Sequence, residues 1–210
     1  MAKYPGGWSL DLTTAEIISQ TFTGGSITIR DNNTALPYPS TIEVTDVFAD
    51  LFDLQVTIEN FSHTFPSDVD VLLVGPEGQS VILMYENGGQ GTATNVDLRF
   101  TDFASATLPT PLVSGTYRPT TNTAFFSLPG PAPSLPYGNS LLQAFQGTNL
   151  NGTWSLYVRD AFAQDFGSIG SWGLTFITAD AGAAAPEPGT LFLVGFGAIA
   201  AGTLLRRRIR

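Results

Sequence analysis

The sequence predicts an all-β protein, an antiparallel sandwich of eight or nine short strands. Over most of the first 180 residues, apolar and polar residues alternate with a period of two, which is the pattern of half-buried strands. Turn-forming Gly, Pro, Asn and Asp residues separate these segments. No helical pattern before residue 186 is long enough to connect parallel strands, so a parallel α/β fold is excluded.

The alternation predicts the individual strands in chain order. It is clearest over residues 26–30, 54–59, 68–74, 80–84, 154–159 and 172–176. Residues 75–78 (Gly-Pro-Glu-Gly) form a strong turn signal, so the strands on either side of them are expected to form a hairpin. Short helical turns are expected at 13–18, capped by Thr13 or Thr14, and at 140–145.

Two segments interrupt the strand pattern. Seven prolines between Leu108 and Tyr137 predict an extended loop excursion, because proline is excluded from the interior of a sheet. Small residues at 179–185 predict a linker that detaches the C-terminal segment. The sandwich is therefore assigned to residues 26–178, after an N-terminal lead-in of residues 1–25.

The charge is distributed unevenly along the chain. The formal net charge is −9, and 17 of the 18 acidic residues precede residue 181. An acidic body disfavours nucleic acids and anionic lipids as partners, and suits cation binding or solubility outside the cell. The chain has no cysteine, which excludes disulfides and thiolate metal sites.

The last 25 residues differ from the body in composition. Pro186-Glu187-Pro188 precedes an uncharged stretch from Leu191 to Leu205, which ends at Arg206, Arg207 and Arg208. As a helix this stretch reaches roughly 23 Å, and Thr190 with the arginines can cover the remainder of a bilayer core of roughly 30 Å. The alternative is an amphipathic or buried helix of a soluble domain, which the lack of a polar face disfavours. A transmembrane helix at about 190–205 is expected, with a cytoplasmic C-terminus.

This tail resembles the PEP-CTERM sorting signal of exported proteins in Gram-negative bacteria that make exopolysaccharide. The resemblance implies that an exosortase in the inner membrane recognises residues 186–210 and cleaves near Pro186-Glu187-Pro188. It implies an exported protein, transiently anchored in the inner membrane and delivered to the cell surface or extracellular matrix. Residues 1–8 lack the hydrophobic region of a secretory signal peptide, so we expect a truncated sequence or a misplaced start codon.

Four motifs in the body occur in a characteristic order. They lie at residues 63–78, beginning with His63, at 115–119 around Arg118, at 145–160 around Trp154, and at 167–176 around Trp172. Over roughly residues 26–177 they resemble the P (Homo B) domain of subtilisin-like proprotein convertases. The resemblance implies a jelly-roll sandwich, similar to galactose-binding-like folds, that accompanies and stabilises a protease domain carrying the catalytic residues.

The motif residues also have direct physical interpretations. His63 is the single histidine and no Gly-x-Ser-x-Gly motif occurs, so a catalytic triad is not expected and His63 is predicted to be a structural hydrogen-bonding residue beside a turn. Trp154 and Trp172 are predicted to be core residues rather than a ligand platform. Arg118, held extended by Pro119, is expected to pair with a nearby carboxylate. We therefore predict no enzymatic activity.

Calcium is the one cofactor that the sequence suggests. Calcium binds clustered carboxylate and carbonyl oxygens, and Asp68 and Asp70 lie two residues apart on one strand face. Asp160 and Asp165 follow another predicted strand, so these four aspartates are the predicted metal ligands, with Asp97 and Asp102 at further strand ends. The alternative is that each is an ordinary turn or edge-strand aspartate, and no EF-hand spacing is present.

Three functions follow from these observations. The first is a non-catalytic exported protein that binds or scaffolds at the surface or in the matrix, with extracellular polysaccharide or surface proteins as partners. The second is a carbohydrate-binding module, in which exposed rings stack on sugars; the candidate rings are Trp8, Tyr38, Tyr85, Tyr117 and Tyr137. The third is an accessory P domain of a subtilisin-like serine protease.

Overall fold

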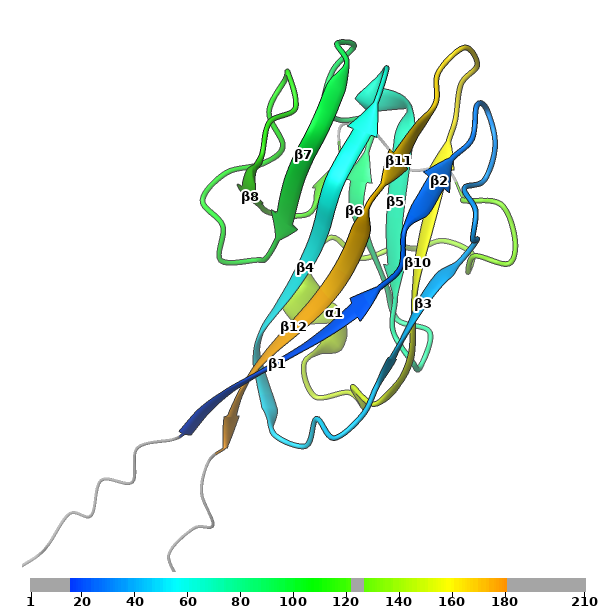
Figure 1. Ribbon diagram of the computed structural model, residues 1–210. Coiled ribbons are helices and arrows are strands. Elements are labelled where there is room, and N and C mark those ends of the chain that lie inside the picture. Colours follow the sequence, from blue (N-terminus) through cyan, green and yellow to red (C-terminus); the bar gives the residue numbers. More distant parts are fainter. Residues whose placement is uncertain (1–15, 122–126, 181–210) are drawn as a thin grey trace, which may run out of the picture. The chain divides into compact units, whose positions relative to one another are not determined.

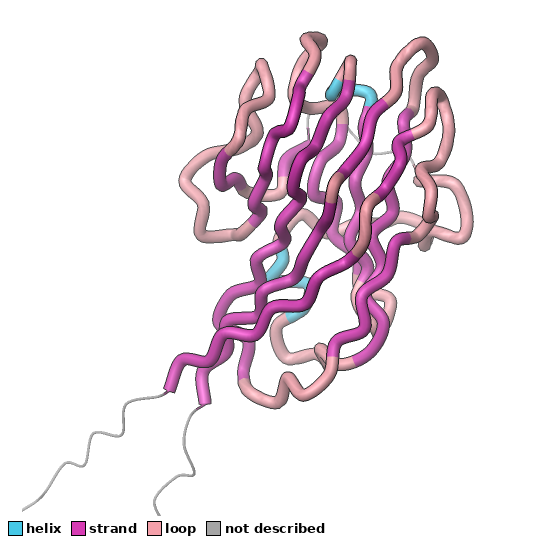
Figure 2. Tube along the Cα trace, in the orientation of Figure 1, coloured by secondary structure: helices cyan, strands magenta, loops and turns pink. Residues whose placement is uncertain are grey.

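Two β-sheets face each other in the computed structural model, which describes residues 16–121 and 127–180 (Figure 1). Figure 2 shows that strands and loops make up nearly all of this part of the chain, with helix confined to short segments. The two-sheet arrangement confirms the prediction of an all-β sandwich. Most of its strand pairings are antiparallel, β6 with β9 and β7 with β8 are short parallel pairings, and an isolated parallel bridge joins Val81 to Gly138.

The first sheet is organised around its longest strand, β4 (Asp50–His63). One edge of β4 pairs first with β12 and then with β11, and the other edge pairs with β7. β1 pairs with β12, β2 with β11, and β8 with β7. These strands are β1 (Glu16–Gly24), β2 (Ile27–Ile29), β7 (Ala93–Phe100), β8 (Gly115–Tyr117), β11 (Gly167–Ile169) and β12 (Ser171–Asp180).

The second sheet has the strand order β3-β10-β5-β6-β9. Its strands are β3 (Ser40–Val44), β5 (Val69–Val74), β6 (Ser80–Tyr85), β9 (Thr120–Thr121) and β10 (Gly152–Asp160). A 3-10 turn, η1 (Pro66–Asp68), leads into β5, and the helix α1 (Leu141–Phe145) precedes β10. The β5–β6 hairpin predicted at residues 75–78 is confirmed: Gly75 N–H donates to the Gln79 carbonyl at 2.8 Å. Gly78 has a φ of +88°, which glycine adopts without strain.

The two predicted helical turns have different outcomes. The turn at 140–145 is confirmed as α1, where the Asp102 carboxylate accepts the Leu141 and Leu142 N–H groups at 3.1 and 2.8 Å. The turn at 13–18 is wrong for the part that the structure describes, because residues 16–18 belong to β1. Pairing with β12 along the sheet outweighs the weak local helix signal. The sandwich therefore begins ahead of the predicted boundary at residue 26.

The main core lies between the two sheets and contains both tryptophans. Trp154 is fully buried, with its ring centroid 4.7 Å from that of Phe145 and 5.4 Å from that of Phe176. Its indole N–H donates to the Leu150 carbonyl at 2.8 Å. Trp172 is 1% exposed and donates to Ser40 Oγ at 2.9 Å. Each indole N–H is thus satisfied inside the core, as burial requires.

A second, smaller core lies on the other face of the second sheet. The proline-rich segment after residue 127 covers this face, and its Tyr137 hydroxyl accepts the Leu128 N–H and donates to the Pro133 carbonyl. The buried residues here are Leu72, Val74, Ile82, Tyr85, Leu128, Tyr137 and Tyr157. All six residues of β5 are consequently buried, so the prediction of a half-buried strand at 68–74 was wrong.

The predicted hydrophobic helix at 190–205 and the sorting residues lie outside the described residues. Of the predicted linker at 179–185, the structure describes residues 179 and 180, and both belong to β12, so the sandwich extends past its predicted end at residue 178. Within residues 16–121 and 127–180, no helix has the length and apolar character needed to cross a membrane. The jelly-roll order of the strands stays a prediction from the family resemblance.

Candidate functional site

The predicted site residues His63 and Asp160 meet in the interior at one end of the sandwich, the upper end in Figure 1. His63 ends β4 and Asp160 ends β10, so the two sheets bring them together. His63 Nε2 lies 3.4 Å from Asp160 Oδ2, and both side chains are fully buried. This pair is internal, with no face open to a ligand.

The hydrogen bonds around this pair assign a structural role to His63. Its Nδ1 accepts the Phe65 N–H at 3.2 Å, which leaves the proton on Nε2, facing Asp160. Asp160 Oδ1 accepts the Phe162 N–H at 3.0 Å. Burial raises the pKa of Asp160, against the opposing effects of the Phe162 N–H and of His63. The imidazole thus links a turn to a carboxylate.

Asp68 and Asp165 lie near Asp160 at the same end. Burial raises the pKa of Asp68 to about 6, and the negative charges of Asp160 and Asp165 act in the same direction. Asp165 Oδ1 accepts the Thr64 hydroxyl at 2.7 Å. The structure therefore brings three of the four predicted calcium ligands into one neighbourhood.

Asp70 is separated from that neighbourhood by its own ion pair. Its Oδ2 lies 2.7 Å from Arg159 Nε, and the two residues are directly opposite each other on β5 and β10. Asp70 is 1% exposed, and burial raises its pKa to about 6 although the Arg159 guanidinium acts to lower it. A carboxylate already engaged by a guanidinium is a poor candidate for a metal ligand. Across residues 16–121 and 127–180, no group of three or more His, Cys, Asp or Glu side chains is placed to hold a metal ion.

Arg118 does not form the ion pair expected of it with any described carboxylate. In this part of the chain Asp70 pairs with Arg159, and Asp160 faces the neutral imidazole of His63, so neither contact involves Arg118. The Arg118 side chain is exposed, and its backbone forms the local contacts: its N–H donates to the Ala106 carbonyl at 2.8 Å. The extended backbone before Pro119 therefore stabilises the loop through its own hydrogen bond and does not position Arg118 for an ion pair.

The rings proposed to stack on sugars are mostly buried. Tyr85, Tyr117 and Tyr137 are at most 7% exposed, and Tyr38 packs edge-on against Tyr157. Trp8 lies outside the described residues. The large exposed rings are instead phenylalanines: Phe48, Phe52, Phe103, Phe162 and Phe166. The assignment of those tyrosines to a ligand surface was wrong, because their hydroxyls are used in internal hydrogen bonds such as that from Tyr117 to the Val113 carbonyl.

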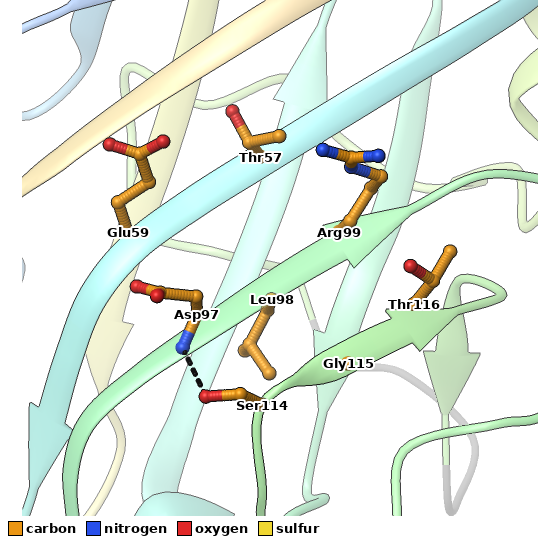
Figure 3. Close-up of a pocket in the computed structure, with 8 residues that line it drawn as sticks. All are labelled: Thr57, Glu59, Asp97, Leu98, Arg99, Ser114, Gly115 and Thr116. Atoms are coloured by element: carbon orange, nitrogen blue, oxygen red, sulfur yellow. Dashed lines mark hydrogen bonds between the residues drawn. The ribbon is translucent and has the colours of Figure 1, made fainter.

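A polar groove of about 520 Å³ lies on the exposed face of the first sheet (Figure 3). Thr57 on β4 is directly opposite Arg99 on β7, which in turn is opposite Thr116 on β8. These three side chains form a row across the strands. Figure 3 shows Glu59 and Asp97 beside this row. The groove thus presents hydroxyls, carboxylates and a guanidinium on a rigid sheet.

Several of these groups are held in place by neighbours. Ser171 Oγ donates to Glu59 Oε2 at 2.9 Å, and Asp97 Oδ1 accepts the Asn60 N–H at 2.8 Å. The Asp97 N–H donates to Ser114 Oγ at 2.9 Å, which joins β7 to the start of β8. Arg99 forms no ion pair with a carboxylate of the described residues, so its donors are open to a ligand.

The sequence did not predict this groove, and of its residues only Asp97 was named as a candidate ligand, for calcium. Thr57, Asp97 and Arg99 each lie at an outward-facing position of a strand whose side chains alternate between the core and solvent. That pattern indicates exposure but not a binding role. Their neighbourhood depends on the register between β4, β7 and β8, and β8 lies within the proline-rich segment. The alternation at 54–59 places Thr57 and Glu59 on the polar face of one strand, which is the signal that the sequence offers for this groove.

Comparison with known proteins confirms both family resemblances. The model of the proprotein convertase P-domain matches residues 51–176, and that of the PEP-CTERM protein-sorting motif matches residues 184–208. The second match contains the predicted sorting residues Pro186, Glu187 and Pro188, together with Arg206, Arg207 and Arg208. No curated protein sequence matches the chain.

Among solved structures, the chain is similar to the serine protease of Aeromonas sobria. The complex of that protease with its chaperone matches at 16% identity with a TM-score of 0.43, covering 82% of this chain. The protease alone matches at 14% identity with a TM-score of 0.42, covering 81% of this chain. In both cases the match covers 28% of the other protein's length, so the present chain corresponds to less than a third of it.

Proposed function

Because the chain belongs to the proprotein convertase P-domain family, we propose that it is a non-catalytic binding module that acts outside the cell. The PEP-CTERM motif indicates an exported protein of Gram-negative bacteria. We assign the sorting step to an exosortase in the inner membrane and the final location to the cell surface or extracellular matrix. The proposed ligand is extracellular polysaccharide, with surface proteins as the other candidate partners.

The observation that carries this proposal is the groove on β4, β7 and β8 (Figure 3). Thr57, Arg99 and Thr116 form a row of hydrogen-bonding side chains across three strands. A polyhydroxylated chain that lies along this row meets donors from Arg99 and both donors and acceptors from the threonines. The two neighbouring carboxylates, Glu59 and Asp97, accept further hydroxyls.

Binding of the purified chain to the producing organism's exopolysaccharide, measured by affinity electrophoresis, tests this proposal. We expect retardation of the wild-type chain and at least a tenfold weaker retention for Arg99→Ala. Arg30→Ala removes the same charge from the β2–β3 connection and serves as the matched control, with unchanged retention. An Arg99→Ala chain that is retained like the wild type contradicts the assignment to the groove.

The sorting step has its own test. In cells that contain exosortase, we expect the C-terminal mass of the mature chain to end near Pro186-Glu187-Pro188, and in cells that lack it we expect the intact tail. Intact tails in both backgrounds would contradict processing, whatever the sandwich binds.

A second candidate function is an accessory domain of a subtilisin-like serine protease, and family membership favours it. In that case the chain would stabilise a protease domain encoded upstream or supplied as a separate protein. A longer reading frame with a subtilisin-type domain before Met1, or co-purification with such a protease, distinguishes this function from matrix binding.

Calcium binding stays a prediction, now restricted to Asp68, Asp160 and Asp165, because Asp70 is held by Arg159. Its support is that burial, and after it the charges of Asp160 and Asp165, raise the pKa of Asp68, although the described residues contain no group of three acidic side chains placed to hold a metal ion. We expect a higher melting temperature in calcium than in chelator. Identical melting curves in the two conditions would contradict it.

A further inference from the structure

Two connections enclose a second pocket at the other end of the sandwich, the lower end in Figure 1. They are the β3–β4 connection (45–49) and the α1–β10 connection (146–151). The pocket has a volume of about 300 Å³. Its lining combines one large ring, Phe48, with the polar side chains of Asp50, Thr148 and Asn149.

Hydrogen bonds fix the two connections to each other. Asn151 Oδ1 accepts the Val47 N–H at 3.0 Å, and Asn151 Nδ2 donates to the Val47 carbonyl at 2.8 Å. Gln146 Nε2 donates to the Leu51 carbonyl at 3.2 Å. The pocket is therefore preformed, which lowers the entropy cost of binding.

Phe48 is presented to solvent from an anchored segment. Its ring is 84% exposed, whereas Val47 beside it is 4% exposed and Leu51 is 3% exposed. Both buried neighbours belong to the main core, so the segment cannot rotate to bury the ring without losing them. The exposure of Phe48 is thus imposed by the fold.

The groups around the ring define the class of ligand. An aromatic face packs against the apolar C–H face of a sugar ring, while hydroxyls need both acceptors and donors nearby. Asp50 supplies acceptors, and the Asn149 amide supplies N–H donors, since its Oδ1 already accepts the Asn151 N–H at 3.1 Å. The Thr148 hydroxyl donates to the Phe145 carbonyl at 2.8 Å, so it is left with acceptor capacity for a ligand. We propose that this pocket is a saccharide-binding site for a neutral or amino sugar, with the pyranose ring stacked on Phe48 and its hydroxyls bound by Asp50 and Asn149.

The charge near the ring favours a saccharide over a membrane surface. Asp46 and Asp50 flank Phe48 in the sequence, and both are exposed. Carboxylates beside an aromatic anchor oppose approach to an anionic bilayer. The same carboxylates disfavour acidic sugars and attract the ammonium group of an amino sugar.

This site is separate from the groove on β4, β7 and β8, so the two assignments can fail independently. The inference shares with the proposed function only the idea that the ligand is a saccharide. Arg99→Ala affects the groove alone and Phe48→Ala affects the pocket alone. If Arg99→Ala loses polysaccharide retention but binds small sugars normally, the groove binds polysaccharide independently of the pocket. If Phe48→Ala loses small-sugar binding but keeps polysaccharide retention, the pocket binds sugars independently of the groove.

The test is a titration of the full chain, followed by nuclear magnetic resonance, with methyl glucoside, methyl galactoside and N-acetylglucosamine. We expect at least one of them to shift the amide signals of residues 47–50 and 146–151. Phe48→Ala should weaken that sugar at least tenfold, and Asp50→Asn should weaken it by a smaller factor. Phe162→Ala, which removes a ring that is 56% exposed at the opposite end, is the matched control and should bind normally.

Three results would overturn the inference. One is the absence of shifts at these residues with all three sugars. Another is equal affinity of the wild type and Phe48→Ala, with both chains folded by circular dichroism. The third is binding of phosphatidylcholine vesicles that Phe48→Ala abolishes while no sugar binds, which would assign the ring to a membrane surface.

Discussion

The two ends of the sandwich differ in how they use polar side chains. At the upper end in Figure 1, His63 Nε2 and Asp160 Oδ2 face each other at 3.4 Å inside the protein without a hydrogen bond between them, and both side chains are fully buried. At the lower end, Phe48 and Asp50 are exposed on a segment that Asn151 holds in place. The upper end is closed by its own contacts, whereas the lower end leaves groups open to a ligand.

The difference partly separates family motifs from binding residues. The motif residues His63, Trp154 and Trp172 are all buried, so the motifs by which the family is recognised here describe how the sandwich is closed. Of the groups that face solvent, Phe48 and Arg99 lie outside those motifs, whereas Thr116 and Arg118 lie inside the motif at 115–119. The motifs therefore describe the core well and the outer surface only in part.

The largest expected effect is at the closed end. Asp160→Ala removes the partner of buried His63 and the acceptor of the Phe162 N–H, so we expect a loss of about 3 kcal/mol in the free energy of unfolding. Thermal unfolding checks this, with an expected decrease of about 6–12 °C. Asp165→Ala, which loses one hydrogen bond from Thr64, should cost only about 1 kcal/mol. Equal effects of the two substitutions would show that the buried pair is not what closes this end.

A smaller effect is expected at the open end. Asn151→Ala removes both hydrogen bonds to the Val47 backbone, and we expect it to cost about 1–2 kcal/mol and to weaken sugar binding at the Phe48 pocket. Urea unfolding measures the first effect and sugar titration the second. Gln143→Ala, on the exposed side of α1, is the control and should change stability by less than about 0.5 kcal/mol. If the Asn151→Ala chain is destabilised but binds sugar with normal affinity, the pocket does not depend on the hydrogen bonds between Asn151 and Val47.

Much of the fold could be predicted from the sequence because strand periodicity is a local signal. The alternation around Val56 and Ile58 and the turn before Gly78 identified β4 and the β5–β6 hairpin. The burial of both faces of β5 could not be predicted, since the cover comes from Leu128 and Tyr137, more than fifty residues away. A period-two pattern reports one buried face and carries no information about a loop that folds over the other.

The candidate sites were harder to predict for a related reason. Tyrosine was chosen as a stacking ring because it is amphipathic, yet Tyr137 uses its hydroxyl to close a loop over the second sheet. Phe48 was overlooked because an exposed phenylalanine has no local sequence signal. Its exposure depends on Asn151, which is remote in the sequence and adjacent in the fold. Residue type suggested which side chains could bind a ligand, but strand register and loop contacts decide which of them are exposed.

A third expected effect concerns the pH dependence of stability, and it should arise at the closed end alone. Burial raises the pKa of Asp70 to about 6 in the folded protein, with the charge of Glu86 acting in the same direction and Arg159 opposing it. In the unfolded chain the pKa of an aspartate is about 3.9. The folded state therefore binds the Asp70 proton more tightly, so its contribution to stability is present below about pH 4 and is lost as the pH rises through about 6.

Asp70→Asn removes this titration while preserving the shape of the side chain. We expect the melting temperature of the wild type, relative to that of the variant, to fall by about 4–8 °C between pH 4 and pH 7, which corresponds to about 2 kcal/mol. Taking the difference between the two proteins cancels the titration of the other carboxylates. Gln143→Ala, which removes no titratable group, is the control and should leave the slope unchanged. If the melting temperature of the wild type minus that of the variant rises with pH instead, the attraction of Arg159 outweighs the effect of burial on the pKa of Asp70. The charged form of Asp70 would then stabilise the closed end.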